Sequence, residues 1–181
     1  MTPSADPPPP SSVPIPPWWA GREEQIQAFL DNRVQRGEVR TLSTSPGGRP
    51  VRAVMYREAE PGLRGTANWG SALGAGQPDA FLRRAERQRP VLMILAGTHG
   101  QEMEGMVAAL SLLSVMETGH DLRGQSQPAL RESLDRLRLV VIPCANPDGR
   151  TRCPCDGWMG LPIAEMARWG QGTRLDGTPY G

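Results

Sequence analysis

The sequence predicts an α/β protein in which two buried, parallel strands end in polar loops at the same edge of a sheet. Two apolar runs, over residues 90–96 and 138–143, have the continuous hydrophobic character of strands covered on both faces. Two amphipathic segments, over residues 102–118 and 128–137, lie between them. The order strand, helix, helix, strand is typical of a crossover that joins parallel strands. Open α/β sheets bind their ligands at the carboxyl ends of such strands.

Length and composition favour a single, loop-rich domain. The chain has 181 residues, enough to bury a core, and contains 19 prolines and 21 glycines. The formal net charge is +1, without a basic stripe, which argues against electrostatic binding of nucleic acid. No apolar run approaches the roughly 18 residues of a membrane span, so we expect no membrane partner.

The N-terminus and the cysteines favour a cytoplasmic location. Residues 1–17 contain eight prolines, no basic residue and no continuous apolar run, unlike an export signal. The chain has three cysteines, and an odd number without an export signal favours reduced thiols. Cys153 and Cys155 are closer than the pair of a C-x-x-C motif, and no second pair accompanies them. We interpret them as free thiols in a loop rather than as metal ligands.

The N-terminal third predicts a tail, a helix and a hairpin. Residues 1–20 are expected to form a proline-rich tail, and residues 21–181 the folded domain. Apolar side chains recur at steps of three and four after Arg22, which predicts a helix that ends near Gly37. The apolar positions of this pattern are Ile26, Phe29, Leu30 and Val34.

Two strand-like segments, over residues 39–44 and 51–56, flank Ser45-Pro46-Gly47-Gly48-Arg49-Pro50 and predict a β-hairpin. Residues 58–78 are rich in glycine and predict a long loop, and residues 79–89 predict a short helix.

His99 and Glu102 are the candidates for a metal site. They follow the strand at residues 90–96, three positions apart, and an imidazole and a carboxylate are both good ligands for Zn²⁺. Gly97 and Gly100 permit the chain to turn between strand and helix. The structural alternative is a hydrogen-bonded histidine beside a helix start, since a lone H-x-x-E is common by chance.

The second strand ends in Asn146-Pro147-Asp148-Gly149. Asn-Pro and Asp-Gly are turn formers, so these residues predict a tight turn. Two turns at neighbouring strand ends would make the floor of a site.

These segments together resemble the zinc carboxypeptidase family of metallopeptidases, the M14 family. The similarity rests on His99-Gly100-Gln101-Glu102 after an apolar strand, and on the run from Ile142 to Gly149 about forty residues later. It extends upstream to the turn from Ser45 to Val51, and so covers roughly residues 22–149. The resemblance implies a three-layer α/β/α sandwich with a mixed, mostly parallel sheet and helices on both faces. We expect this chain to hold the first half, with about four strands and one open edge.

By this resemblance His99 and Glu102 are the first two zinc ligands, Zn²⁺ is the cofactor, and a peptide or small amide is the substrate. The metal would lower the pKa of a bound water and polarise the scissile carbonyl. The family takes a third ligand, a histidine, and a general base, a glutamate, from later in the domain. The other histidine here, His120, is expected at the far end of the helix at residues 102–118, about 25 Å away. His120 therefore cannot be the third ligand, and no general base is identified in the sequence. We expect the chain to be the N-terminal portion of a longer enzyme.

The family also binds substrate through arginines that follow the Asn-Pro-Asp-Gly turn, because a guanidinium pairs well with a carboxylate. We select Arg174, with Asn146, as candidate substrate-binding residues; a solvated surface position is the structural alternative for each arginine in the region. The other arginines there are Arg150, Arg152 and Arg168.

Two alternatives to a carboxypeptidase remain open from the sequence. A zinc deacylase of the aspartoacylase kind also uses a His-x-x-Glu pair, although the Asn-Pro-Asp-Gly turn favours the peptidase. A truncated module without catalytic activity is the second alternative.

Overall fold

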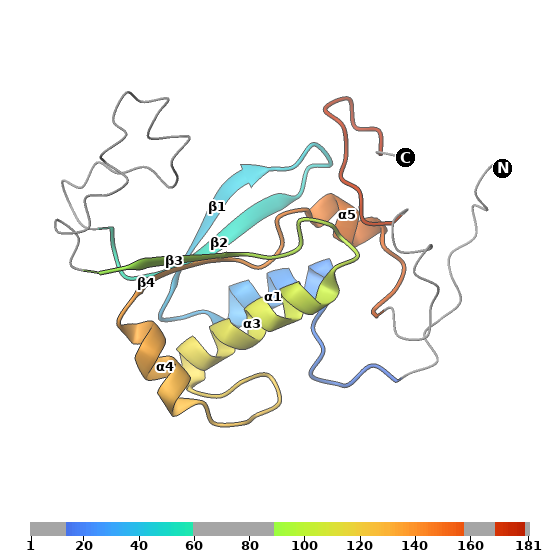
Figure 1. Cartoon of the computed structure of the whole chain (residues 1–181). Helices are drawn as coiled ribbons and strands as arrows, with labels where there is room; N and C mark the ends of the chain where they lie inside the picture. The colour runs from blue at the N-terminus through green and yellow to red at the C-terminus, as the bar shows by residue number, and fades with distance from the viewer. Residues whose placement is uncertain (1–13, 60–88, 158–168, 180–181) are drawn as a thin grey trace.

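The computed structural model describes residues 14–59, 89–157 and 169–179. In these ranges four strands form one mixed sheet in the order β1-β2-β4-β3, and the three longer helices lie along one side of it (Figure 1). The mixed α/β sheet predicted from the sequence is confirmed. The elements are α1 (Glu23–Arg33), β1 (Glu38–Thr44), β2 (Pro50–Tyr56), β3 (Val91–Leu95), α3 (Met103–Thr118), α4 (Pro128–Asp135), β4 (Arg138–Ile142) and α5 (Pro147–Arg152).

Several predictions lie outside the described residues. They are the helix at residues 79–89, nearly all of the loop at 58–78, and the first thirteen residues of the tail. In the ranges that are described, no helix combines the length and the apolar character needed to cross a membrane.

The predicted hairpin and the predicted parallel pair are both confirmed. β1 and β2 pair antiparallel around a turn in which the Ser45 N–H donates to the Arg49 carbonyl at 2.8 Å. Gly48 in this turn has φ of +81°, a conformation that favours glycine. β3 and β4 pair in parallel, and β2 joins them by pairing antiparallel with β4. Of the three strand pairings in the described part, two are therefore antiparallel.

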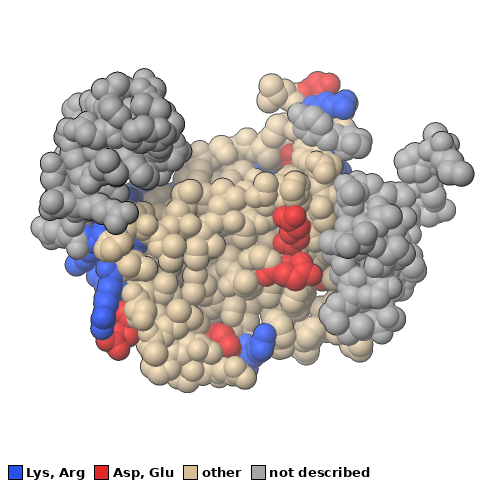
Figure 2. All heavy atoms as spheres, viewed as in Figure 1, with Lys and Arg blue, Asp and Glu red and all other residues tan. Residues whose placement is uncertain are grey.

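β3 lies at the edge of the sheet, whereas the sequence predicted a strand covered on both faces. Within the described residues it pairs with β4 alone. Its apolar side chains are accordingly exposed, up to 58% for Met93. The side of the molecule seen in Figure 2 is largely uncharged, apart from a group of acidic side chains within it and other charged side chains toward its border. Within the part of the chain that the structure describes, this edge is open, and it carries the apolar residues that predicted a buried strand.

α3 provides much of the core. It runs from Met103 to Thr118 and is capped by Gly119, which has φ of +82° and donates its N–H to the Val115 carbonyl at 2.8 Å. This left-handed C-terminal residue is the helix stop that the sequence predicted. The apolar face of α3 packs with residues of α1, β2 and β4 in one cluster, whose fully buried members include Ile26, Leu30, Val54, Met106, Leu110, Leu113, Leu139 and Val141.

Glu117, near the end of α3, fixes the connection between α1 and β1. Its carboxylate accepts the backbone N–H groups of Gln35, Arg36 and Gly37 at 3.0, 2.8 and 3.1 Å. It also accepts the Tyr56 hydroxyl at 2.6 Å. These bonds require the chain at residues 35–37 to turn toward α3, so α1 ends at Arg33 rather than near the predicted Gly37. Burial of Glu117 alone would raise its pKa, but the bonds from Tyr56 and the three amides outweigh burial and lower it.

We expect Glu117→Gln to lower the free energy of unfolding by about 1.5–3 kcal/mol at pH 7, since several donors lose a charged acceptor. The folded pKa of Glu117 lies below its unfolded value of about 4.3. Its stabilisation is therefore complete above that pH and is lost as the pH falls through the folded pKa. Urea unfolding of both proteins from pH 6 to pH 3 measures this: the difference should shrink toward acid.

Glu132→Gln is the matched control, because its pair with Arg136 is exposed at 70% and 74% of the two side chains. That substitution should change stability by less than about 0.5 kcal/mol. Equal losses in the two variants would contradict a structural role for Glu117.

Candidate metal centre

The loop after β3 brings His99 and Glu102 together. Nδ1 of His99 lies 3.0 Å from Oε1 of Glu102, and the side chains are 48% and 52% exposed. Gly97, at φ of +63°, begins the turn, and the Glu102 N–H closes it by donating to the His99 carbonyl at 3.2 Å. The two predicted ligands therefore converge at the carboxyl end of β3, in contact with solvent.

The pair has the right donors and nearly the right spacing for zinc. Two ligands at about 2.1 Å from a tetrahedral Zn²⁺ lie about 3.4 Å apart. The observed separation of 3.0 Å needs to widen by only a few tenths of an ångström. As exposed side chains, both can make this adjustment without disturbing the core. His99 and Glu102 thus fit two positions of a zinc site.

A third protein ligand is not present in the described ranges. No group of three or more histidine, cysteine, aspartate or glutamate side chains there is placed to hold a metal. His120 follows the end of α3, whose 16 residues at about 1.5 Å each separate it from Glu102 by some 24 Å. Its Nδ1 lies 3.1 Å from the Thr118 carbonyl instead. The prediction that His120 is too distant to complete the site is confirmed.

The loop after β4 lies directly beside the loop after β3. The sheet ladder continues past the strands, because Ala145 donates its N–H to Ala96 and Asn146 donates its N–H to Gly97, both at 2.9 Å. Residues 146–149 do not form the isolated turn that the sequence predicted. They begin α5, and the Asn146 side chain caps this helix by accepting the Gly149 N–H at 2.9 Å.

The Asn146 amide serves the protein's own backbone. Its Nδ2 donates to the Thr98 carbonyl at 3.2 Å and to the Gly170 carbonyl at 3.1 Å. Both amide hydrogens are therefore used, and Oδ1 holds the Gly149 N–H. Asn146 thus positions the residue next to His99 and ties it to α5, while its contact with substrate stays a prediction.

Three glycines let the loops approach this closely. A Cβ on Gly100 would overlap the backbone of Gly149, and a Cβ on Gly149 would overlap the Gly170 carbonyl. A Cβ on Gly170 would in turn overlap the Gln101 side chain. The Gly100 N–H donates to the Gly170 carbonyl at 2.8 Å, so the contact is also hydrogen-bonded. The sequence showed the glycines of both motifs but not that they touch.

Arg150 is a buried structural residue. It is 3% exposed, and Nη1 donates to the Gly100 carbonyl at 3.0 Å while Nη2 donates to the Cys155 carbonyl at 2.6 Å. The guanidinium thus links the His99–Glu102 loop to the segment after α5. Cys153 and Cys155 are free thiols, as predicted, but both are buried. Burial raises the pKa of the Cys155 thiol.

Asp148 connects the hairpin turn to α5. It is 2% exposed and accepts bonds from the Ser45 hydroxyl, the Gly47 N–H and the Arg49 guanidinium at 2.8, 2.9 and 3.0 Å. Burial alone would raise the pKa of Asp148; the bonds from Ser45, Gly47 and Arg49 outweigh it and lower the pKa. Sequence reasoning missed this role because it interpreted Asp148 only as a turn residue.

The remaining candidate arginines lie near the C-terminus. Arg174 is exposed in a turn where its N–H donates to the Thr178 carbonyl at 2.8 Å. Arg152 donates through Nη2 to the Gly172 carbonyl at 2.8 Å. Arg168 lies outside the described residues.

A family model described as zinc carboxypeptidase matches residues 23–155. The chain belongs to this family. The matched range contains both candidate ligands, the hairpin turn, Asp148 and Arg150. It also includes all eight helices and strands of the described part.

Individual relatives are more distant. The chain is 34% identical to human carboxypeptidase D over 68 residues, which cover 38% of this chain and 5% of that protein. Among solved structures, it is similar to a metallo-carboxypeptidase from Burkholderia cenocepacia, with a TM-score of 0.47 and 21% identity over 71% of this chain and 28% of that one. It is also similar to carboxypeptidase A from Helicoverpa armigera, with a TM-score of 0.45 and 14% identity over 84% and 27%. The chain thus spans less than a third of the length of these proteins.

We expect Gly100→Ala to destabilise the protein by about 3 kcal/mol or more, because the new methyl group meets backbone that cannot move aside. Gly105→Ala is the matched control. Its Cβ would lie 3.7 Å from the Ala96 Cβ, an ordinary contact, inside α3. Alanine there should be neutral or stabilising by up to about 1 kcal/mol. Thermal and urea unfolding of both variants measures the contrast. Similar stability of the two variants would show that the loops are not in contact.

Proposed function

We propose that His99 and Glu102 are two ligands of the zinc centre of a metallocarboxypeptidase-type hydrolase, which removes C-terminal residues from peptides. One observation carries the proposal: in a member of the zinc carboxypeptidase family, an imidazole nitrogen and a carboxylate oxygen lie 3.0 Å apart at the carboxyl end of a strand. Ligand sites of open α/β sheets occupy this edge.

Bound zinc would supply an activated water and an electrophile that polarises the scissile carbonyl. The chain's own residues fix where that happens. His99 and Glu102 would hold the ion, and the Asn146 amide binds the Thr98 carbonyl beside His99. Arg150 binds the Gly100 carbonyl between the two ligands. The loop is thereby held on both sides of His99 by side-chain hydrogen bonds, of which the one from Arg150 is buried.

The third ligand and the general base are proposed to come from residues beyond the ranges described here. Two protein ligands alone bind zinc weakly, and structural and catalytic zinc sites use three or four. Arg174 stays our candidate for the substrate carboxylate, since it follows α5 and is exposed.

Metal titration tests the two ligands. We expect His99→Ala and Glu102→Ala each to weaken binding of Zn²⁺ or Co²⁺ by more than about tenfold, because each removes one donor from the site. His120→Ala is the matched control and should leave affinity unchanged, as His120 lies at the other end of α3. Isothermal titration, or the visible absorption of Co²⁺, gives the affinity without relying on turnover. Equal effects of the three alanines would contradict the assignment.

Activity requires a protein in which the catalytic domain is complete. We expect such a protein to release C-terminal residues from peptides, to stop on chelation, and to recover with added Zn²⁺. Faster hydrolysis of N-acyl amino acids than of peptides would instead support the zinc deacylase. Metal binding without hydrolysis of either substrate would support a non-catalytic module.

A further inference from the structure

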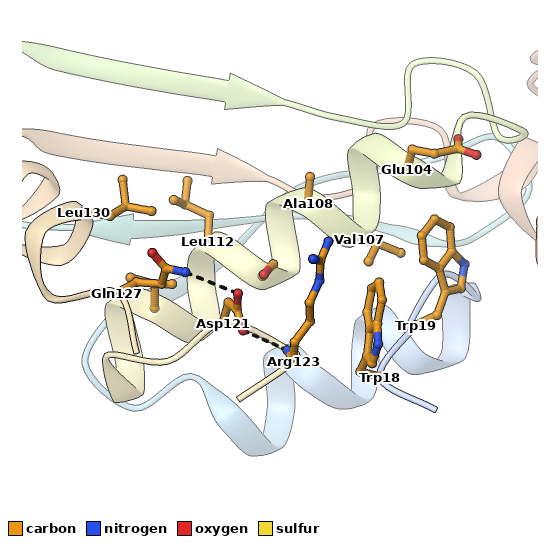
Figure 3. A pocket seen from close by; sticks show the side chains of 12 residues that line it. Trp18, Trp19, Glu104, Val107, Ala108, Leu112, Asp121, Arg123, Gln127 and Leu130 are labelled. Atoms are coloured by element: carbon orange, nitrogen blue, oxygen red, sulfur yellow. Dashed lines mark hydrogen bonds between the residues drawn. The ribbon is translucent and has the colours of Figure 1, made fainter. Parts of the chain in front are cut away.

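A groove on the outer side of α3 is lined by aromatic and aliphatic side chains that no part of the metal centre uses. We call it the tryptophan groove. It encloses about 380 Å³ between the segment before α1, the helix α3 and the loop that leads to α4 (Figure 3). Its apolar lining comes from Trp18, Trp19, Val107, Ala108, Leu112, Val115 and Leu130.

Ring contacts and hydrogen bonds hold the walls of the groove in place. The rings of Trp18 and Trp19 have centroids 5.8 Å apart at an angle of 57°, and the Arg123 guanidinium lies 5.0 Å from the Trp18 centroid. Asp121 fixes the loop that carries Arg123 by accepting the N–H groups of Arg123 and Gln125, both at 2.9 Å. The two indoles and the guanidinium plane therefore form a preformed aromatic wall, as Figure 3 shows.

Aromatic-lined grooves of this kind suit polyproline helices. Proline rings stack on indole faces, and a proline-rich segment is already extended, so its binding costs little conformational entropy. Such a segment is part of this chain: eight of the first seventeen residues are proline, including the run from Pro7 to Pro10. We infer that the tryptophan groove binds the chain's own residues 3–13 as a polyproline helix.

Chain length permits this in the same molecule. The described chain begins at Pro14, four residues before Trp18, so the segment starts within about 15 Å of the groove along the backbone. The lining residues of α3 run from Glu104 to Val115, about 17 Å along the helix. Eleven residues in polyproline geometry span about 34 Å, enough to turn back and cover that length. So short a tether gives an effective concentration in the millimolar range.

Charge sets the end at which the segment binds. Asp6 is the acidic residue of the first seventeen, which contain no basic one, and it directly precedes the proline run. Arg123 is the cation among the described lining residues, and it lies at the Trp18 end. Of the two lining carboxylates, Asp121 accepts backbone N–H groups and Glu104 lies at the Trp19 end. We therefore expect the segment to bind with Asp6 beside Arg123 and with Pro7 to Pro10 across the indoles.

Methyl and indole NMR spectra of the full chain test the inference. The comparison is with a four-serine variant, which carries Pro7→Ser, Pro8→Ser, Pro9→Ser and Pro10→Ser. We expect the signals of Trp18, Val107, Leu112 and Leu130 to shift between the two proteins, whereas those of β4 stay in place. The shifts should be independent of protein concentration. Unchanged groove signals overturn the inference, and shifts that grow with concentration alongside dimer in sedimentation would assign the groove to a second copy instead.

A synthetic peptide of residues 3–13 gives an independent measurement. It should bind the four-serine variant at least about tenfold more tightly than the wild type, whose groove is already occupied. Adding Trp18→Ala to the four-serine variant should lower its affinity for the peptide by at least about tenfold. Arg123→Glu in the four-serine variant should lower the affinity for the peptide about threefold, and a peptide with Asp6→Lys should restore the affinity of that protein. Arg136→Glu is the control, exposed beyond α4, and should have no effect. Equal binding to all these proteins overturns the inference.

Discussion

The candidate centre depends on the close backbone contact between the loop after β3 and the beginning of α5. Two hydrogen bonds continue the parallel ladder beyond the strands, from Ala145 to Ala96 and from Asn146 to Gly97. Glycines at 100 and 149 remove the side chains that would keep the loops apart. Since His99 lies inside the contacted loop, its position follows from a backbone contact and not from packing of its own, half-exposed ring.

The contact between the two loops buries the charged side chains of Asp148 and Arg150, and the hydrogen bonds of these side chains stabilise the contact. Asp148 and Arg150 are both nearly inaccessible to solvent, and burying either charge without partners would cost several kcal/mol. Asp148 has three donors from the hairpin turn, and Arg150 has carbonyl acceptors on both sides of α5. The hairpin, α5 and the His99 loop therefore form one hydrogen-bonded unit. Removing the partners of Asp148 or Arg150 would leave a buried charge without hydrogen bonds.

The elements of the fold were predictable because their signals are local. Periodicity gave α1 and α3, glycine gave the hairpin turn and the end of α3, and the two apolar runs gave the parallel pair. The end of α1 was not predictable, since it depends on Glu117, some eighty residues away. The structural roles of Asn146, Asp148 and Arg150 were missed for the same reason: each depends on a partner that only the folded chain brings near. The proximity of His99 and Glu102 was predictable because they lie only three positions apart in the chain.

The candidate metal ligands and, within the described residues, the open sheet edge occur on the same element. β3 exposes Val91, Met93 and Leu95 at 47%, 58% and 49%, and Glu102 follows the same strand. A hollow of about 480 Å³ between β3 and α3, lined by Leu95, Gly105 and Leu112, extends to Glu102. A strand that paired with β3 would cover these apolar side chains and end near the candidate metal ligands, because neighbouring strands lie only about 4.8 Å apart. Under the proposed function, the residues that complete the zinc centre and those that cover this edge are therefore expected to belong to one segment.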